Sequence, residues 1–360
     1  MPANLTPEYF KAQEKYESAN TREEKICALE EMIRACPKHK GTEKLLAQLK
    51  RKLAKLRKES TATKAKVKPK FTLKKEGAAR ISIMGVANSG KSSLLRVLTN
   101  AKPEVADYPY TTKEPVAGMF HYKEVPIQVL EIPSNFEYVN FARESELICF
   151  LLDLTLDIKE QKSQLVKVCE DFGIKINKER PKIEIKRVPS GGIEVQGRKH
   201  LKFDESLFKE ILIEHGIHNA VVTLYEDVDP ERLYEALNES LVYVKAVWVG
   251  NKSDIAKVGY EGIKISTTSL EGIEELKELL YQNLDIIRVF TRSKGEIMHP
   301  PIALKRGSTV RDVAERVHKD FLKNFKYARI WGPSAKFDGA TVGLEHVLQD
   351  GDVVEIYAKK

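Results

Sequence analysis

The sequence has few cysteines and no long apolar run, and each of these features excludes a class of protein. Its cysteines form no CxxC pair and are too sparse for a disulfide framework, with four in 360 residues, at positions 27, 36, 149 and 169. The longest apolar run, Leu147 to Leu152, is far shorter than the roughly 20 residues of a membrane span. The N-terminus is polar and charged, unlike a secretory signal. We therefore expect a reduced, cytoplasmic protein without a membrane segment.

One short segment carries a phosphate-binding pattern. An apolar run that starts at Ile81 leads into Gly85-Val-Ala-Asn-Ser-Gly90-Lys91-Ser92, which has the spacing GxxxxGK[ST] between a predicted strand and a predicted helix. The glycines let backbone N–H groups turn toward phosphate oxygens, the lysine places a charge at the outer phosphates, and the serine hydroxyl suits Mg²⁺. A glycine turn with an exposed lysine is the alternative. We predict that Lys91 also acts in catalysis and that the nucleotide phosphates are bound by Asn88, Ser89, Gly90, Lys91, Ser92 and Ser93.

A second motif indicates which base the nucleotide carries. After an apolar strand that ends near Val249, the chain reads Asn251-Lys252-Ser253-Asp254, the form NKxD, at a strand end where open α/β sheets bind their ligands. A carboxylate accepts both guanine N1–H and the amino group of guanine, and adenine lacks this donor pair. We expect Asp254 to select GTP, Asn251 to join the loops, and the stem of Lys252 to cover the base. Alone, the motif also fits an Asn-Lys turn before a helix.

Two further residues are candidates for the base-binding loop. Ser266 and Thr267 follow Ile263-Lys-Ile265, a predicted last strand, and precede a predicted helix. A plain Ser/Thr turn before a helix explains these residue types equally well. The order of the motifs along the chain favours contacts with the base.

Taken together, these motifs resemble those of the Obg-like GTPases, and among them the developmentally regulated GTP-binding (DRG) proteins of archaea and eukaryotes. The resemblance also rests on Tyr108-Pro-Tyr-Thr-Thr112 followed by Gly118, and on a C-terminal segment from about Arg288 that is similar to a TGS domain. It implies an α/β fold: a P-loop GTPase with a doubly wound sheet, an N-terminal helical arm, an inserted αβ subdomain and a C-terminal β-grasp (TGS) domain. It also implies GTP or GDP as ligand, with Mg²⁺.

The two switch segments follow the family only in part. The resemblance implies that Thr112, or Thr111 in its place, meets Mg²⁺ and the γ-phosphate. Relatives carry Asp-x-Pro-Gly in the second switch, where this chain has Glu131-Ile-Pro-Ser134. Glu131 keeps the charge on a longer side chain, and Mg²⁺ tolerates poor geometry badly; Ser134 makes a positive φ costlier than glycine does. We expect Ser92, Thr112 and Glu131 to bind the metal weakly or in a rearranged way, and hydrolysis to be slow.

Asn88 is a candidate for a further role in catalysis. In some related GTPases an asparagine at this place helps to hold a K⁺ ion that acts instead of an arginine finger. An asparagine in a tight loop is also a good turn former. Both interpretations stay open.

Positive charge is concentrated in one segment. Residues 44–75 contain thirteen Lys or Arg and one acidic residue, a local charge of +12 in a chain of net charge +8, so the rest of the chain is acidic. Leucines at 46, 49, 53 and 56 have helical spacing, and residues 60–70 have the composition of a linker. Such a segment neutralises phosphates, although a solvated helix face is the alternative. It favours the ribosome or structured RNA as partner, and no DNA partner is expected.

The sequence predicts four regions: a helical region with the basic helix (1–60), a basic linker (61–78), an Obg-type G domain (79–287) and a TGS domain (288–360). Two helices are expected over 6–19 and 21–35. About 90 residues separate two successive core strands, more than a βαβ crossover needs, so an insert over about 173–240 is expected. Apolar alternation on both sides of Pro189-Ser-Gly-Gly192 predicts a hairpin, followed by helices at 205–214 and 230–239.

The sequence predicts that the TGS domain consists of strands around one helix. A capping box at Thr309 begins the helix, with Val313, Val317 and Phe321 on one face. Three aromatic residues, Phe325, Tyr327 and Trp331, fit either base stacking or the domain core. A protein partner on this domain is a further expectation.

Two hypotheses follow for function. The first is a GTPase that binds and slowly hydrolyses GTP and acts in translation or in ribosome- or RNA-associated regulation. The second is a hydrolysis-impaired adaptor that holds guanine nucleotide while its basic segment and TGS domain tether RNA or protein partners.

Overall fold

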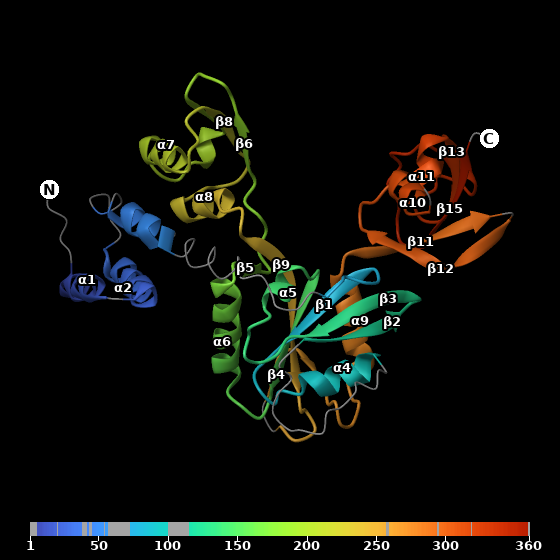
Figure 1. The fold of residues 1–360 in the computed structure, drawn as a ribbon, viewed down its shortest axis with the longest axis horizontal. Coiled ribbons are helices and arrows are strands. Elements are labelled where there is room, and N and C mark those ends of the chain that lie inside the picture. The colour runs from blue at the N-terminus through green and yellow to red at the C-terminus, as the bar shows by residue number, and fades with distance from the viewer. Residues whose placement is uncertain are drawn as a thin grey trace. The chain divides into compact units, whose positions relative to one another are not determined.

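The computed structural model describes residues 6–19, 21–37, 42, 45–53, 55–56, 73–99, 115–256, 259–293, 295–317 and 319–358. The chain divides into two compact units (Figure 1). The first unit holds Met1–Lys68 and Cys169–Tyr243, and the second holds Pro69–Val168 and Val244–Lys360. Both candidate nucleotide motifs belong to the second unit. Within the described residues, no helix is long and apolar enough to cross a membrane.

A mainly parallel sheet forms the core of the second unit. Its strands run in the order β10-β9-β4-β1-β3-β2, and β2 pairs antiparallel with β3 while the other pairs are parallel. Along β4 every residue is buried, as expected for a parallel strand covered on both faces. The strand bounds are β1 Ala79–Met84, β2 Val116–Tyr122, β3 Val125–Glu131, β4 Leu147–Asp153, β9 Val242–Asn251 and β10 Ile263–Lys264.

Helices cover both faces of this sheet. On one face, α4 (Lys91–Thr99) and α9 (Ile273–Asn283) contribute apolar residues such as Leu94 and Leu276 to the main core. On the opposite side lie α6 (Ile158–Asp171) and the short α5 (Asn140–Arg143) (Figure 1). Because β1, β3, β4 and β9 run in the same direction, the residues at their carboxyl ends meet at one edge of the sheet.

The N-terminal arm consists of α1 (Pro7–Ser18), α2 (Arg22–Ala35) and a helical segment at 45–53 and 55–56. The predicted capping box is confirmed, because the Thr21 hydroxyl accepts from the Glu24 N–H and the Glu24 carboxylate accepts from the Thr21 N–H. Leu49 is buried in a cluster with Tyr9 and Leu29. The leucine face of the basic helix is therefore a packing surface against the first two helices.

The prediction of a hairpin in the insert is wrong. The insert sheet has the order β6-β8-β7, so β8 (Ala220–Leu224) lies between β6 (Ile183–Arg187) and β7 (Ile193–Gln196). It pairs antiparallel with β6 and parallel with β7. The buried side chains of β8 fill the middle of the subdomain core, which a two-stranded hairpin would leave without a central strand. The other elements of the subdomain are a 3₁₀ turn (Arg198–His200), α7 (Glu205–Glu214) and α8 (Pro230–Leu237). The short strand β5 (Ile174–Ile176) pairs with β9 and so belongs to the large sheet.

The C-terminal segment forms the predicted β-grasp sheet. Its strand order is β12-β11-β15-β13-β14, with β11 and β15 parallel at the centre. Val313 in α10 packs into the core, whereas Val317 is 42% exposed because α10 ends at this residue; the predicted stripe is wrong at Val317. The elements are β11 Ile286–Ser293, β12 Glu296–Lys305, α10 Val310–Val317, α11 Lys319–Lys323, β13 Phe325–Trp331, β14 Ala340–Val342 and β15 Asp352–Ala358.

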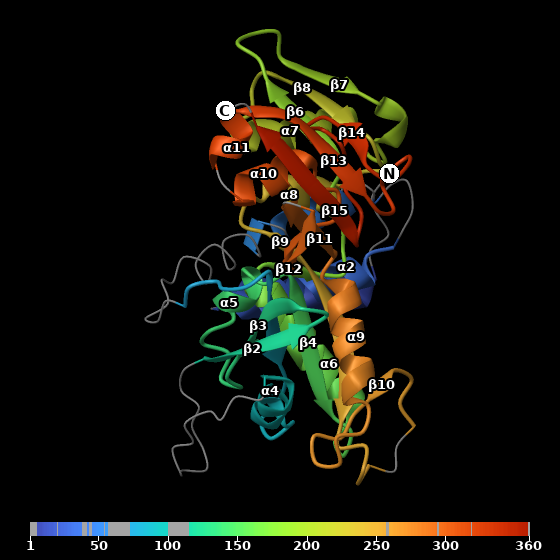
Figure 2. The same cartoon turned by 90° about the vertical axis from the view of Figure 1, so that its right-hand side faces the viewer.

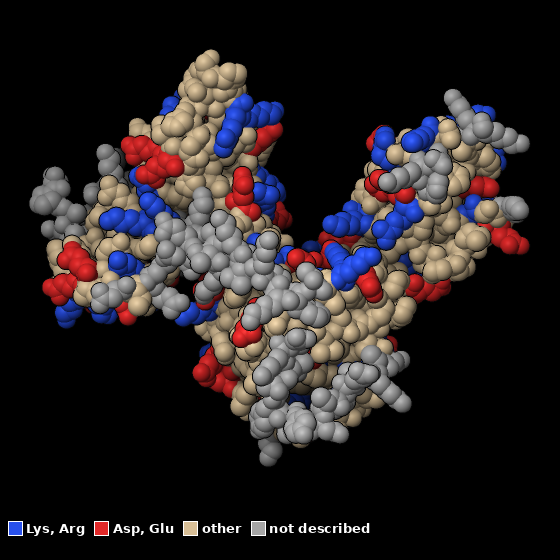
Figure 3. All heavy atoms as spheres, in the orientation of Figure 1, with Lys and Arg blue, Asp and Glu red and all other residues tan. Residues whose placement is uncertain are grey.

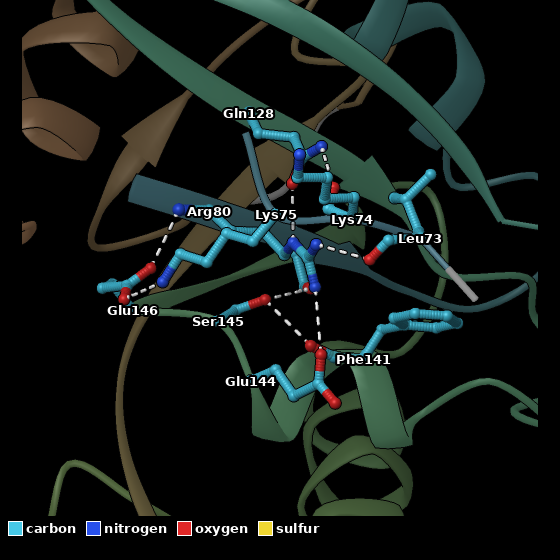
Figure 4. A network of polar contacts seen from close by, with 10 residues as sticks. Leu73, Lys74, Lys75, Arg80, Gln128, Phe141, Glu144, Ser145 and Glu146 are labelled. Carbon is cyan, nitrogen blue, oxygen red and sulfur yellow. Dashed lines mark hydrogen bonds and ion pairs between the residues drawn. The ribbon is translucent and has the colours of Figure 1, made fainter. Parts of the chain in front are cut away.

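A buried arginine ties the end of the basic segment to the start of the sheet (Figure 4). Arg80 in β1 is 0% exposed. Its Nε donates to Gln128 Oε1 at 2.7 Å, its Nη1 to Glu144 Oε2 at 3.2 Å and its Nη2 to the Leu73 carbonyl at 3.0 Å. Gln128 Nε2 in turn donates to the Lys74 carbonyl at 3.1 Å. Residues 73 and 74 are thus anchored at the end of β1 that lies away from the phosphate loop.

Replacing this arginine tests the anchor. Arg80→Met leaves acceptors on buried Gln128 and half-buried Leu73 without their donor, so we expect the free energy of unfolding to fall by about 2–4 kcal/mol in denaturant titrations. The matched control is Lys75→Met, which removes the pair that Lys75 makes with Glu146; the Lys75 side chain is 41% exposed, so a loss below about 1 kcal/mol is expected. Equal losses in the free energy of unfolding would show that the Arg80 network stabilises the fold no more than the Lys75–Glu146 pair does.

Candidate functional site

The phosphate-binding pattern lies in the loop between β1 and α4, and its glycines are sterically required. Gly90 has φ 95° and Asn88 has φ 61°, both in the left-handed region. A Cβ at Gly90 would lie 2.3 Å from Asn251 Nδ2, and a Cβ at Gly85 would lie 2.4 Å from the Leu151 carbonyl oxygen. The loop therefore keeps a backbone cradle that side chains at these two positions would fill. The helix that begins at Lys91 directs its N-terminus to the same cradle.

The ammonium of Lys91 is fully engaged. It is buried, and its Nζ donates to the Gly85 carbonyl at 3.1 Å, to the Val86 carbonyl at 2.9 Å and to Ser134 Oγ at 2.7 Å. Burial lowers the pKa of Lys91, and the nearby Glu131 carboxylate opposes this shift. An ammonium has three N–H donors. Two of them bond the loop carbonyls, and the third bonds Ser134 of the second switch.

A second bond joins the same two segments. Ser92 Oγ donates to Glu131 Oε1 at 2.7 Å, and Glu131 is the buried last residue of β3. Burial raises the pKa of Glu131, while the bond from Ser92 and the charges of Lys91 and Arg96 oppose the shift. A hydroxyl and a carboxylate oxygen side by side are the hard donors that Mg²⁺ prefers, so these residues fit the metal.

The structure describes no cluster of three or more His, Cys, Asp or Glu side chains that would hold a metal by themselves. This composition suits Mg²⁺, which proteins usually hold with one or two side chains while substrate phosphates supply further ligands. Ser134 itself has no positive φ; the left-handed residue of this segment is Phe136, with φ 57°. The cost expected for a serine at this position is therefore not incurred in this conformation.

Asn251 connects the phosphate loop to the predicted base loop. It is 1% exposed; its Nδ2 donates to the Ser89 carbonyl at 2.8 Å, and its Oδ1 accepts from the Thr267 N–H at 3.2 Å. Ser266 is buried, and its Oγ accepts from the two backbone N–H groups of Thr268 and Ser269. Ser266 therefore shapes the turn, and Thr267 lies at the junction of the two loops.

The sequence reasoning missed one residue of this edge, Asp153 at the end of β4. It is 2% exposed, and its Oδ2 lies 2.5 Å from Lys252 Nζ, while Lys252 has φ 66°. Burial would raise the pKa of Asp153, but hydrogen bonds from Lys252 and Thr155 outweigh it and hold that pKa below its usual value. The pair fixes the direction of the Lys252 stem. An acidic residue directly after the apolar run 147–152 was the signal that could have revealed it.

Two buried hydroxyls in the motifs have no hydrogen-bond partner among the described residues, Ser89 Oγ and Ser253 Oγ. Unsatisfied buried hydroxyls are unusual, and they favour a site that is completed by a bound group. Asp254, in contrast, is exposed beside Ser253 and open to a ligand.

Part of the first switch lies outside the described residues, including Tyr108, Thr111 and Thr112. Gly118, which follows it, lies in β2. A Cβ at Gly118 would lie 2.6 Å from a side-chain carbon of Thr99, so the close packing of β2 on α4 explains this glycine.

One positive charge of the basic helix in the arm is paired with acidic residues of the same chain. Arg51 forms ion pairs with Glu214 and, at 3.8 Å, with Glu210, both in α7. Basic residues (Lys and Arg) and acidic residues (Asp and Glu) are interspersed on the face drawn in Figure 3. His215 is the C-cap residue of α7.

Family models match three consecutive parts of the chain. A model described as "50S ribosome-binding GTPase" matches residues 80–184, one for the C-terminal region of that domain matches 190–286, and a TGS domain model matches 287–358.

Similar proteins cover nearly the whole chain. A GTP-binding protein of Methanocaldococcus jannaschii is 35% identical, over 94% of this chain and 93% of that protein. Developmentally-regulated GTP-binding protein 1 of Xenopus laevis is 32% identical, over 93% of this chain and 98% of that protein. Developmentally-regulated GTP-binding protein 2 of Homo sapiens is 31% identical, over 93% of this chain and 99% of that protein. The chain is therefore a GTP-binding P-loop GTPase with a C-terminal TGS domain, and it belongs to the developmentally regulated GTP-binding protein family.

Proposed function

We propose that this protein is a slow GTPase of the cytoplasm whose nucleotide state regulates its association with the ribosome or with structured RNA. The observation that carries the proposal is the direct bonding of the second switch to the phosphate loop, through Ser134 to Lys91 and through Glu131 to Ser92. An outer phosphate would compete with Ser134 for Lys91, and Ser92 and Glu131 would give up their mutual bond to hold Mg²⁺. Nucleotide binding must therefore rearrange these bonds, which couples the switch to the ligand.

The residues of this edge have distinct roles in the proposal. Backbone groups of Asn88, Ser89 and Gly90, with Lys91, Ser92 and Ser93, hold the phosphates; Asn251, Ser266 and Thr267 shape the base loop. Asp254 accepts both guanine donors, and Lys252, directed by Asp153, covers the base. Ser92, Glu131 and Thr112 would hold Mg²⁺, which would neutralise developing phosphate charge. Slow turnover follows because Glu131 is longer, and Ser134 bulkier, than the residues that relatives carry.

The proposed partner rests on charge and on the domains. The segment 44–75 carries the +12 that neutralises phosphates, and the matched GTPase model is described as ribosome-binding. We assign the arm to residues 1–60, the linker to 61–78, the G domain to 79–287 with its insert near 173–240, and the TGS domain to 288–360. A protein partner on the TGS domain is the second candidate.

A hydrolysis-impaired adaptor is the alternative function, and one observation favours it. Lys91 and Ser92 already have protein partners for their donors, so these two residues are held in place without GTP hydrolysis. In that case the nucleotide serves as a structural ligand.

The altered second switch is tested by restoring the residues of relatives. The double variant Glu131→Asp, Ser134→Gly is expected to hydrolyse GTP at least about tenfold faster in a single turnover, a change of about 1.4 kcal/mol in the barrier. The shorter carboxylate and the freed Lys91 restore ordinary geometry at the metal and the γ-phosphate. The matched control is Glu137→Asp, the same change at an exposed residue of the same segment, with no expected effect. Unchanged turnover despite tight GTP binding would favour the adaptor.

Base selection depends on Asp254. Asp254→Asn replaces a carboxylate that accepts two guanine N–H groups, so we expect GDP affinity to fall by at least about 100-fold. Binding of a fluorescent GDP analogue measures this, with Glu261→Gln as an exposed acidic control that leaves affinity unchanged. Unchanged GDP affinity in Asp254→Asn would show that Asp254 does not bind the base.

Potassium dependence is tested at Asn88. Glycine keeps the positive φ of this position and removes the side-chain oxygen, so Asn88→Gly separates an ion ligand from a turn former. We expect wild-type hydrolysis to be faster in K⁺ than in Na⁺ at equal ionic strength, and the ratio to fall to about one in the variant. A ratio of one in the wild type would assign Asn88 to the turn alone.

A further inference from the structure

The sheet of the TGS domain has two chemically different faces. Ala328, Ile330 and Val354 point into the domain core and are 0% exposed. Because side chains alternate along a strand, Tyr327 and Trp331 lie on the opposite face of β13. Tyr357 of β15 is directly opposite Tyr327 in the antiparallel register, so it shares that face. The strands β13 and β15 lie toward the viewer in Figure 2.

Aromatic rings on this outer face stack on one another and lie beside guanidinium groups. The rings of Tyr327 and Tyr357 stack with their centroids 4.6 Å apart and 19° between their planes. The Arg292 guanidinium carbon lies 4.5 Å from the Trp331 ring centroid, and that of Arg329 lies 5.5 Å from the Tyr357 centroid. These side chains are only partly buried, or exposed in the case of Arg329.

The domain core does not account for these rings. Buried members of the core come from the other face, and Phe325 packs against them, but Tyr327, Trp331 and Tyr357 do not belong to that cluster. The sequence left open whether the three aromatic residues of β13 belong to the core or are available for base stacking. Phe325 packs with the core, whereas Tyr327 and Trp331 lie on the outer face.

Charge on this face favours an anion. Arg292, Arg329 and Lys326 flank the rings, the last with its Nζ 6.0 Å from the Tyr327 centroid. Glu355, opposite Arg329 in the register, brings a negative charge, and its bond to the Tyr357 hydroxyl raises the pKa of Tyr357. Cations outnumber this carboxylate, and they surround rings whose faces suit nucleobases.

We propose that this outer face binds single-stranded RNA, with unpaired bases stacked on Trp331 and on the Tyr327–Tyr357 pair and with Arg292, Arg329 and Lys326 at the phosphates. The inference rests on the proposed association with RNA and names the kind of RNA that this face takes. Bases in a duplex are stacked on one another and present no free face, whereas single strands do. Tyr327 and Trp331 are about 13 Å apart along β13, so two separate bases of one strand stack at once.

The test measures binding of the full chain to two fluorescent RNA probes, a 12-nucleotide single strand of mixed sequence and a 16-base-pair duplex. The double variant Tyr327→Leu, Trp331→Leu is expected to bind the single strand at least about tenfold more weakly, since each stacked base is worth about 1–3 kcal/mol. Duplex affinity, which the basic segment supplies, stays unchanged. Phe337→Leu is the matched control, because Phe337 is 68% exposed in the β13–β14 connection, and it leaves both affinities unchanged.

Two further measurements keep the test decisive if the double variant folds poorly. Arg329→Gln on the intact aromatic face is expected to lower the slope of log affinity against log salt for the single strand by about one. In a Trp248→Phe background Trp331 is the single tryptophan, and its fluorescence is expected to fall when single strands bind and not when duplex binds.

The outcomes separate this inference from the proposed function. Unchanged single-strand binding by a folded double variant, or equal loss for both probes, would overturn the stacking face while RNA association stands. A wild-type chain that binds neither probe nor ribosomes would overturn the proposed function itself. Protection of Trp331 by a purified protein partner, without any response to single strands, would also overturn the inference in favour of a protein surface.

Discussion

The candidate site depends on the amide of Asn251, which lies 162 residues from Ser89 in sequence and joins the phosphate loop to the base loop. Its Nδ2 bonds the phosphate loop and its Oδ1 bonds the Thr267 N–H, so one buried side chain sets the distance between the two motifs. The bond requires close approach, which Gly90 permits by having no Cβ. The parallel sheet makes this meeting possible, because β1 and β9 both deliver their carboxyl ends to one edge.

Around this connection, charged groups of the edge are matched by partners from within the chain. Lys91 is held by two loop carbonyls and Ser134, Ser92 by Glu131, and Lys252 by Asp153. Buried charges need such partners, since an unpaired one carries a large desolvation cost. A ligand that binds Lys91 and Ser92 therefore exchanges partners with the protein, whereas the Ser89 and Ser253 hydroxyls are open to a new bond. The second switch is the element that contributes the exchangeable bonds, which gives the nucleotide a physical route to the rest of the chain.

Away from this edge, the chain offers polar surfaces of two kinds. The arm carries lysines on a helix whose leucine side is packed, with Arg51 committed to α7. The TGS sheet carries aromatic rings with guanidinium groups beside them. A dense set of lysines attracts any phosphate backbone, while stacked rings discriminate by the presence of a free base. The Arg80 network anchors residues 73 and 74, near the end of the basic segment, to the sheet.

The sequence by itself determined the features that depend on neighbours along the chain. The phosphate loop, NKxD and the capping box at Thr21 are local because each needs particular backbone angles or side chains within a few residues, and the buried strands needed only continuous apolar runs. Resemblance to the family supplied the arrangement of domains. The tertiary structure decided the order β6-β8-β7, the pairing of Asp153 with Lys252, the capture of Lys91 by Ser134, and which aromatic residues of β13 face outward. These features join residues far apart in sequence, and no local pattern records which of several chemically suitable partners the folded chain brings within bonding distance.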